Sequence, residues 1–262
     1  MNYSTLEIER NYQISTISLN RPAIRNAFND VMIRELTVAF KEEQTSEDVR
    51  AIVLRGKGKV FCAGADLNWM RASAQVSYDK NYQDSLLMAA CFEQIYRCSK
   101  PTLAVVHGAA MGGAMGLIAA CDFAFCDAGA QFALSEIKLG MVPATISPYI
   151  IKRMGEYSAR ELMLTGKLFT GKEAWEYKLV NQCFHDIHSM EAHLQSTLQM
   201  LMSSGPGAVT ACKKLIDDVV NQLPAAAFPE YTAQMIATLK ASEEGQEGMT
   251  AFLEKRKPNW TK

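Results

Sequence analysis

Residues 101–126, PTLAVVHGAAMGGAMGLIAACDFAFC, constrain the fold of this chain more than any other stretch. Residues 102–106 are apolar or small and predict a buried strand, which runs into a loop of glycines and alanines at residues 108–113. A helical run follows, and Asp122 begins a second apolar strand. Glycines at the start of a helix let a ligand approach free N–H groups, which suits a phosphate, a carboxylate or a developing oxyanion. A tightly packed strand–turn–helix without a ligand explains the same pattern equally well.

The composition is that of a globular protein with a sizeable core. Hydrophobic residues make up 48% of the 262 residues, and the net charge of −1 provides no basic surface for nucleic acid or anionic lipid. Seven cysteines without a CxxC pair favour a reducing compartment. The N-terminus passes directly into strand-like alternation, without the features of a signal or transit peptide. We therefore expect a cytoplasmic protein that spans no membrane and binds no nucleic acid.

Short strands are expected in the first half of the chain and helices in the last third. Residues 5–10 and 13–19 alternate apolar and polar side chains, which predicts a β-hairpin. Asn29 is a candidate N-cap for the next helix, and Asp66 is one for a later short helix. Further strands are expected at 51–54, 131–134 and 180–184, and helices near 147–154, 157–165, 172–178, 188–203, 206–222, 225–241 and 243–256.

The apolar spacing within two helices predicts which of their residues face the core. For the helix after Asn29, we expect Val31, Leu36 and Phe40 to face inward. A second amphipathic helix is predicted over residues 78–98, with apolar positions at Leu86, Leu87, Ala90 and Ile95.

Two patterns imitate ligand sites. Residues 166–173, GKLFTGKE, have the spacing of a phosphate-binding loop, but Glu173 stands where serine or threonine is needed. Three histidines lie close together near two carboxylates, at His185, His188, His193, Asp186 and Glu191. They do not repeat at the spacing of a structural zinc site, so we expect a solvated loop there and no metal.

Several motifs, in order, resemble the crotonase (enoyl-CoA hydratase/isomerase) superfamily over essentially the whole chain. They are LNRP with NAF (19–28), AIVLRG (51–56), FCAGADL (61–67), PTLAVVHGAAMGGAMG (101–116), CDFAF (121–125), AQFALSEIKLGMVP (130–143), LTGKLFTGKEAWEYKLVN (164–181) and EGMTAFLEKRKPNW (247–260). The resemblance implies an α/β fold, a spiral of ββα units over residues 1–200, followed by a helical trimerisation region over 201–262. It also implies a homotrimer or a hexamer built as a dimer of trimers.

The chemistry implied by the resemblance is stabilisation of an acyl-CoA thioester enolate by two backbone N–H groups. By motif match these belong to Ala65 and Gly113, and removing one such donor typically costs roughly 10²–10³ in rate. Hydratases of the family commonly use two glutamates, of which one matches Glu136 and the other falls at Gly116. Glu136 would therefore carry both proton transfers in turn, or the reaction is a proton shuttle between carbons.

The resemblance is closest to bacterial methylglutaconyl-CoA hydratases of leucine catabolism. Those proteins resemble this chain in having a small residue at the position of Gly116, and residues 143–147 are PATIS where typical hydratases have PGAGG. We hypothesise that Gly116 leaves room for a branched acyl group with a distal carboxylate. The candidate partners for that carboxylate are Arg71, Lys138, Lys152 and Arg153.

The resemblance also assigns binding residues by motif position. The expected substrate pocket comprises Gly116, Leu67, Trp69, Met70 and Pro143. The expected CoA-binding residues are Arg25, Ala27 and Ala63, with Phe252 and Lys255 reaching the nucleotide of a neighbouring subunit. No separate cofactor is expected, because coenzyme A is part of the substrate.

Three functional hypotheses remain open from the sequence. The first is hydration of a branched, carboxylated enoyl-CoA, specifically 3-methylglutaconyl-CoA to 3-hydroxy-3-methylglutaryl-CoA. The second is a Δ3,Δ2-enoyl-CoA isomerase or a general enoyl-CoA hydratase, because a single base at Glu136 suffices to move a proton between carbons. The third is a non-catalytic CoA-binding or RNA-binding scaffold, against which the near-neutral charge and the absence of an aromatic and basic stripe argue.

Overall fold

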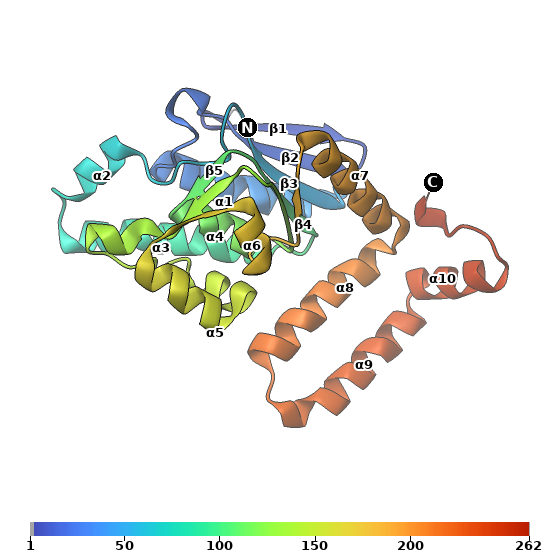
Figure 1. The fold of residues 1–262 in the computed structure, drawn as a ribbon. Coiled ribbons are helices and arrows are strands. Elements are labelled where there is room, and N and C mark those ends of the chain that lie inside the picture. Colours follow the sequence, from blue (N-terminus) through green and yellow to red (C-terminus); the bar gives the residue numbers. More distant parts are fainter. Residues whose placement is uncertain (1–2, 262) are drawn as a thin grey trace. The chain divides into compact units, whose positions relative to one another are not determined.

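The protein is described by a computed structural model that covers residues 3–261 (Figure 1). The chain divides into two compact units. The first comprises residues 3–98 and 102–193, and the second comprises residues 99–101 and 194–261. Apart from residues 99–101, the units divide between residues 193 and 194, whereas the resemblance implied a boundary between residues 200 and 201. No helix within the described residues is both long and apolar enough to span a bilayer.

A six-stranded sheet forms the centre of the first unit. Its order is β1-β2-β3-β4-β6-β9; β1 and β2 are antiparallel, and the other neighbouring pairs are parallel. Tyr12, with φ 51°, turns the chain between the first two strands, so the predicted hairpin is confirmed. The strands are β1 (Leu6–Asn11), β2 (Ile14–Leu19), β3 (Ala51–Gly56), β4 (Thr102–Val106), β6 (Phe123–Asp127) and β9 (Gln182–Phe184).

A second sheet of three short strands gives the first unit its repeating character. It has the order β5-β7-β8, formed by Ala109–Met111, Gln131–Ala133 and Leu168–Thr170. From β4 onward the chain twice places one strand in the large sheet and the next in the small one, since β4 is followed by β5 and β6 by β7. Residues 109–111 were expected to be loop, but they pair with β7 in parallel and therefore form a strand.

Several helices that begin in the first unit start at polar caps, two of which the sequence predicts. The side chain of Asn29 accepts a hydrogen bond from Met32 N–H, and Asp66 accepts from Asn68 and Trp69 N–H. Both predicted N-caps are thereby confirmed. The helices are α1 (Asp30–Thr45), α2 (Leu67–Ser73), α3 (Tyr78–Tyr96), α4 (Gly113–Ala120), α5 (Ser147–Thr165), α6 (Gly171–Glu176) and α7 (Ile187–Ser203), with 3₁₀ turns η1 (Pro22–Ile24) and η2 (Ser135–Leu139).

Several residues expected to face the core are exposed instead. Val31 is exposed on α1, whereas the helix buries Met32, Ile33, Leu36 and Phe40. In α3, Leu86, Leu87 and Ala90 are exposed, whereas Cys91, Phe92 and Ile95 are buried. Burial in α3 is thus confined to its last two turns, and the apolar spacing of the earlier turns does not decide which side packs. The two helices expected near 147–154 and 157–165 are confirmed: both belong to α5, and Gly155 separates them with a non-helical backbone (φ 78°, ψ 160°).

The second unit consists of helices. They are α8 (Pro206–Asp217), α9 (Phe228–Ala241) and α10 (Glu243–Leu253), with short helical turns at η3 (Asp218–Gln222), η4 (Ala225–Ala227) and η5 (Asn259–Thr261). The Glu244 carboxylate accepts hydrogen bonds of 2.8 Å from both Gly207 and Ala208 N–H. A carboxylate at a helix N-terminus satisfies donors that have no partner within the helix. This contact ties α10 to the start of α8.

Candidate active site

Two glycine-containing loops of the first unit run side by side. Cys62 N–H donates to Ala109 O at 3.0 Å, and Met111 N–H donates to Cys62 O at 3.1 Å. Phe28 joins the first of these loops from a third segment, because its N–H donates to Gly64 O and its carbonyl accepts from Asp66 N–H, each at 2.9 Å. These backbone contacts bring three segments that are distant in sequence to one place.

The backbone N–H groups of Ala65 and Gly113 have no hydrogen-bond acceptor among residues 3–261. Gly113 is the first residue of α4, where an N–H has no partner within the helix. Ala65 immediately precedes Asp66, the N-cap of α2. Both residues are half-buried, so a ligand atom can still reach them. Two such donors are what a developing thioester oxyanion requires.

Phe28 explains why position 113 holds glycine. A Cβ atom on Gly113 would overlap Cζ of Phe28 and would lie 3.0 Å from Cε1 of the same ring. The Phe28 side chain is buried, and its ring centroid lies 6.4 Å from that of Trp69 in α2. The ring therefore occupies the space that any larger residue at position 113 would need.

Glu136 lies beside the second glycine loop. It belongs to η2, directly after β7, and Gly112 N–H donates to Ala133 O of β7 at 2.9 Å. A Cβ atom built on Gly112, whose φ is 54°, would lie 3.2 Å from Glu136 Oε1. The structure thus places the predicted catalytic carboxylate next to the residue that precedes the free Gly113 amide.

The carboxyl group of Glu136 is poorly solvated. Its Oε2 atom is buried and has no hydrogen-bond partner within the described chain. Burial raises the pKa of the Glu136 carboxyl above its usual value. A carboxylate with a raised pKa is a stronger base, and the unpaired oxygen can accept a proton from a substrate or from water.

Gly116 does not leave the open space that we hypothesised. It is buried within α4, and a Cβ atom there would overlap Cγ2 of Ile146 and lie 2.9 Å from Cε1 of Phe92. The hypothesis that Gly116 provides room for the acyl group is therefore wrong, because side chains of the protein fill that room. Ile146 belongs to the PATIS segment, so the two departures from the usual hydratase pattern are in contact with each other.

The loop that was expected to bind CoA is tied to the first glycine loop. Ala63 N–H donates to Arg25 O at 2.9 Å, and Arg21 donates to Ala27 O at 2.6 Å and to the Asp66 carboxylate at 2.9 Å. Arg25, Ala27 and Ala63 are thereby brought together, with the Arg25 side chain exposed. Phe252 and Lys255 belong to the second unit, where the Phe252 side chain is exposed and Lys255 has φ 55°.

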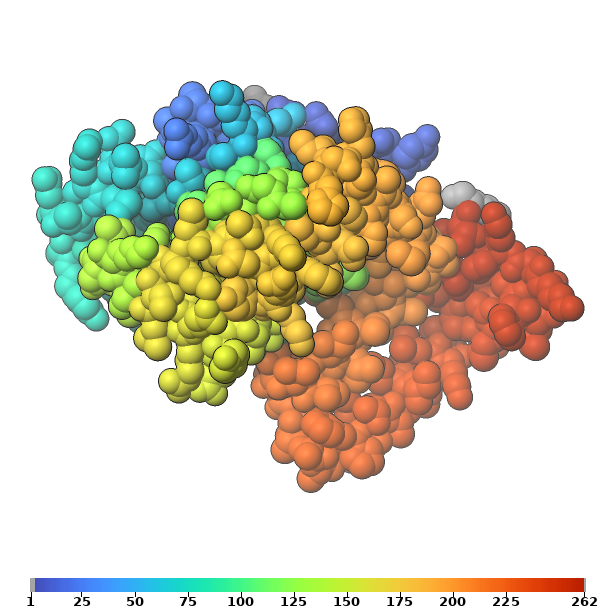
Figure 2. Space-filling model, viewed as in Figure 1, coloured from blue at the N-terminus to red at the C-terminus, as the bar shows by residue number. Residues whose placement is uncertain are grey.

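The expected pocket residues differ in exposure. Helix α2, at the edge of the first unit in Figures 1 and 2, carries the exposed Leu67 and the half-buried Trp69 and Met70, while Pro143 is buried. Burial would raise the pKa of Asp66 at the start of α2. Hydrogen bonds from Asn68 N–H and Arg21 outweigh that effect and hold the pKa below its usual value. An ionised Asp66 thus fixes this end of α2.

Two of the four candidate partners for a distal carboxylate have other roles. Arg153 is half-buried and donates to Leu179 O, Cys121 O and Asn181 Oδ1 at 2.5–2.8 Å. Lys152 lies over the Tyr96 ring, 5.2 Å from its centroid. Arg71 of α2 and Lys138 of η2 remain as candidates.

Cys62 lies in the first glycine loop but is unsuited to nucleophilic catalysis. Its side chain is buried, and its Sγ atom lies 3.0 Å from Asn26 O. Burial raises the pKa of the Cys62 thiol to about 12, so the thiolate is scarce at neutral pH.

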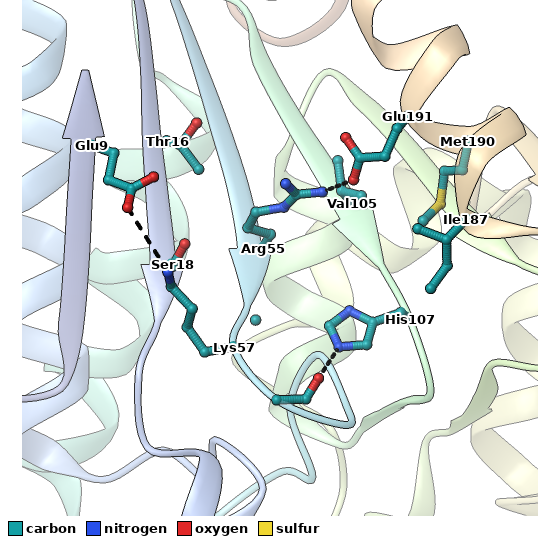
Figure 3. Close-up of a pocket in the computed structure, with 12 residues that line it drawn as sticks. Glu9, Thr16, Ser18, Arg55, Lys57, Val105, His107, Ile187, Met190 and Glu191 are labelled. Carbon is teal, nitrogen blue, oxygen red and sulfur yellow. Dashed lines mark hydrogen bonds and ion pairs between the residues drawn. The ribbon is translucent and has the colours of Figure 1, made fainter. Parts of the chain in front are cut away.

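A separate hollow of about 380 Å³ lies against β2, β3 and β4 near the start of α7 (Figure 3). Its basic side chains all have partners: Arg55 pairs with Glu191, Lys57 with Glu7 and Glu9, and His107 with Gly58 O. None of the residues expected at the active site lines it. In the stretch with three histidines, the Asp186 carboxylate accepts a hydrogen bond from Ser189 N–H. No cluster of three potential metal ligands occurs in the described part of the chain.

Phe28 and Ile146 were not among the site residues predicted from the sequence. Each is an apolar side chain that fills the space above a glycine of α4. The NAF motif and the PATIS segment marked their neighbourhoods. No spacing rule connects either residue to its glycine, because the contacts are made across the fold.

Comparisons with known proteins give this geometry its context. Residues 9–262 match the family model described as enoyl-CoA hydratase/isomerase. The chain is 31% identical to a mitochondrial Delta(3,5)-Delta(2,4)-dienoyl-CoA isomerase of Dictyostelium discoideum, with 98% of this chain and 91% of that protein covered. It is also 31% identical to the 2,3-dehydroadipyl-CoA hydratase of Escherichia coli, with 98% of each covered.

The fold is shared with solved structures as well. A crystal structure of an enoyl-CoA hydratase from Shewanella pealeana superimposes with a TM-score of 0.94 at 36% identity, covering 98% of this chain and 96% of that one. The chain therefore belongs to the enoyl-CoA hydratase/isomerase family, and its fold is the crotonase fold.

Proposed function

We propose that this protein is a hydro-lyase that adds water to a branched, carboxylated 2-enoyl-CoA, converting 3-methylglutaconyl-CoA to 3-hydroxy-3-methylglutaryl-CoA. The observation that carries the proposal is one buried carboxylate, Glu136, beside the free N–H of Gly113, with glycine at position 116 where two-carboxylate hydratases have their other glutamate. The substrate is an acyl-CoA thioester, and no separate cofactor takes part.

In the proposed mechanism, the thioester oxygen accepts hydrogen bonds from the N–H groups of Ala65 and Gly113. The Glu136 carboxylate removes a proton from water as the water oxygen bonds to C3 of the enoyl group. The electron pair of the C2–C3 double bond moves toward C2 and the thioester, and the two amides stabilise the resulting enolate. Protonated Glu136 then returns its proton to C2, so that one molecule of water has been added.

Two considerations support the carboxylated substrate. The motifs resemble those of bacterial methylglutaconyl-CoA hydratases, and the 2,3-dehydroadipyl-CoA hydratase relative is named for a substrate that also carries a second carboxylate. Glycine at position 116 keeps one negative charge away from an acyl group that brings its own. We assign recognition of the distal carboxylate to Arg71 or Lys138.

A Δ3,Δ2-enoyl-CoA isomerase is the second candidate function. A single carboxylate can remove a proton from C2 of a 3-enoyl-CoA and return it to C4 by way of the same amide-bound enolate. The isomerase from Dictyostelium discoideum is a relative that supports this alternative. A general 2-enoyl-CoA hydratase uses the same groups on a linear substrate.

We further propose that the protein acts in the cytoplasm as a homotrimer or as a dimer of trimers. Arg25, Ala27 and Ala63 would bind CoA in one subunit, with Phe252 and Lys255 reaching the nucleotide of a neighbour. The exposed Phe252 side chain supports this role. Light scattering coupled to size exclusion would measure the oligomeric state, and a monomer would contradict the proposal.

A panel of acyl-CoA thioesters tests the function. Methylglutaconyl-CoA, linear 2-enoyl-CoA and linear 3-enoyl-CoA are each followed for gain or loss of the conjugated enoyl absorbance, with products separated by chromatography. We expect the highest kcat/KM with methylglutaconyl-CoA. Turnover of linear 3-enoyl-CoA without turnover of methylglutaconyl-CoA would overturn the proposal in favour of the isomerase.

A further inference from the structure

Two glycines lie at and near the start of α4, each against a different kind of side chain. Gly112 is the N-cap of α4, with φ 54°, and Gly116 is the fourth residue of the helix, about one helical turn further along. The Cβ direction of Gly112 leads to the Glu136 carboxylate, and that of Gly116 leads to Ile146 and Phe92. The Glu136 carboxylate therefore lies beside the N-cap of α4, and an apolar barrier lies about one turn further along the helix.

The barrier is built from buried side chains of two other elements. Ile146 is 1% exposed and immediately precedes α5, and Phe92 is 2% exposed in α3. The neighbouring Thr145 donates a hydrogen bond of 3.3 Å to Sδ of Met88, which fastens the segment to α3. Ile146 therefore has little freedom to move aside.

A small apolar hollow lies beside Phe92. Its volume is about 10 Å³, and its lining includes Phe28, Met88, Phe92 and Leu117. Phe28 packs against Gly113, whose N–H is free, and Phe92 packs against Gly116. The two rings that pack against these glycines, Phe28 and Phe92, therefore both line the hollow.

We propose that Ile146, backed by Phe92, is the specificity-determining end wall of the acyl site. Gly116 is glycine because it must seat Ile146 there. An acyl group that is bound through its thioester oxygen and reacts at Glu136 meets this wall after about one helical turn. The wall admits short acyl chains, branched ones included, and excludes long straight chains. This inference rests on the proposed enoyl-CoA chemistry and adds the residue that sets acyl length.

The test compares Ile146→Ala and Ile146→Val with the wild type on straight-chain 2-enoyl-CoA thioesters of four to ten carbons. We expect the ten-carbon to four-carbon ratio of kcat/KM to rise at least about tenfold in Ile146→Ala, mainly through KM, and less in Ile146→Val, because a few methylenes in an apolar pocket account for such factors. Ile150→Ala is the matched control, since Ile150 is an equally buried isoleucine one turn further along α5. Its ratio should stay within about twofold of the wild type.

A binding measurement separates this inference from the proposed reaction. Butyryl-CoA and decanoyl-CoA are saturated and need no turnover, so calorimetric titration reports acyl length preference whichever reaction the enzyme catalyses. We expect the wild type to prefer butyryl-CoA and Ile146→Ala to lose that preference. The assignment of Ile146 as the end wall would be overturned if folded Ile146→Ala and Ile146→Val kept the preference for butyryl-CoA. An equal change of that preference in Ile150→Ala would overturn it as well. Failure of methylglutaconyl-CoA turnover alone would overturn only the proposed substrate.

Discussion

Replacing Gly113 by alanine is expected to reduce kcat/KM about 10²–10³-fold in a protein that still folds. The added Cβ would overlap Cζ of Phe28 and lie 3.0 Å from Cε1, whereas carbon atoms in contact prefer about 3.5–4.0 Å. The ring is buried, so part of the displacement must fall on the backbone at residue 113. A shift of roughly 1 Å misplaces the amide, and loss of one oxyanion donor costs about 2.7–4 kcal/mol of transition-state stabilisation.

The stability change in the same variant should be smaller than the change in activity. Overpacking a buried site typically costs about 1–3 kcal/mol, and the preference of alanine for helices offsets up to about 1 kcal/mol of that. Thermal unfolding followed by circular dichroism would confirm that the variant is folded. Steady-state rates are measured by the loss of the conjugated enoyl absorbance.

A double variant decides whether the overlap is the cause. Leucine at position 28 lacks the ring atoms that the new Cβ would meet, so Gly113→Ala/Phe28→Leu should recover at least about tenfold over Gly113→Ala. Gly129→Ala, at an exposed glycine with ordinary backbone angles, is the control that should keep its activity. The steric argument is refuted if Gly113→Ala keeps more than about a third of wild-type activity, or if the double variant recovers none.

Two further substitutions follow from the ionisation of site carboxylates. Glu136→Gln should lower kcat/KM about 10²–10⁴-fold, and wild-type activity should decline as pH falls through the raised pKa of Glu136. Because that pKa is higher in the folded state, ionised Glu136 destabilises the native protein; Glu136→Gln should therefore raise the melting temperature at about pH 8 and lose this advantage at about pH 4. If Glu136→Gln and the wild type had equal melting temperatures at each of these pH values, the burial of this charge would be contradicted. Asp66→Ala should destabilise the native state by about 0.5–2 kcal/mol at neutral pH, through loss of the α2 cap. The pKa of Asp66 is depressed in the folded state, so the stability lost in Asp66→Ala should shrink as pH falls through that pKa. Urea titrations of both proteins at neutral and acidic pH measure this difference in unfolding free energy. An equal difference at both pH values would contradict the reasoning.

Local chemistry explains why much of the fold could be predicted from the sequence. The N-caps at Asn29 and Asp66 are short-range interactions between a side chain and the N–H groups two or three residues later, so sequence alone suffices to find them. The apolar run of β4 is buried on both faces, and it was predicted as a strand for that reason. The positions of Ala65, Gly113 and Glu136 came from motif resemblance rather than from spacing.

The structural predictions that proved wrong share one cause: the packing partners of these residues come from distant segments of the chain. The predicted inward positions Leu86 and Leu87 are exposed because only the last two turns of α3 are buried. Residues 109–111 form a strand because β7 lies beside them, and their glycine-rich surroundings give no local sign of it.

Gly116 shows which properties of the site follow from the sequence and which follow only from the tertiary structure. The sequence by itself shows glycine at this position, and the family resemblance predicts that Glu136 is then the one carboxylate that moves protons. Only the tertiary structure showed that Ile146 and Phe92 occupy the space above Gly116, which reversed the expectation of an open pocket. A glycine in a sequence states only that a side chain is missing. What fills the vacated volume depends on the side chains that other elements bring to it, because protein interiors are close-packed.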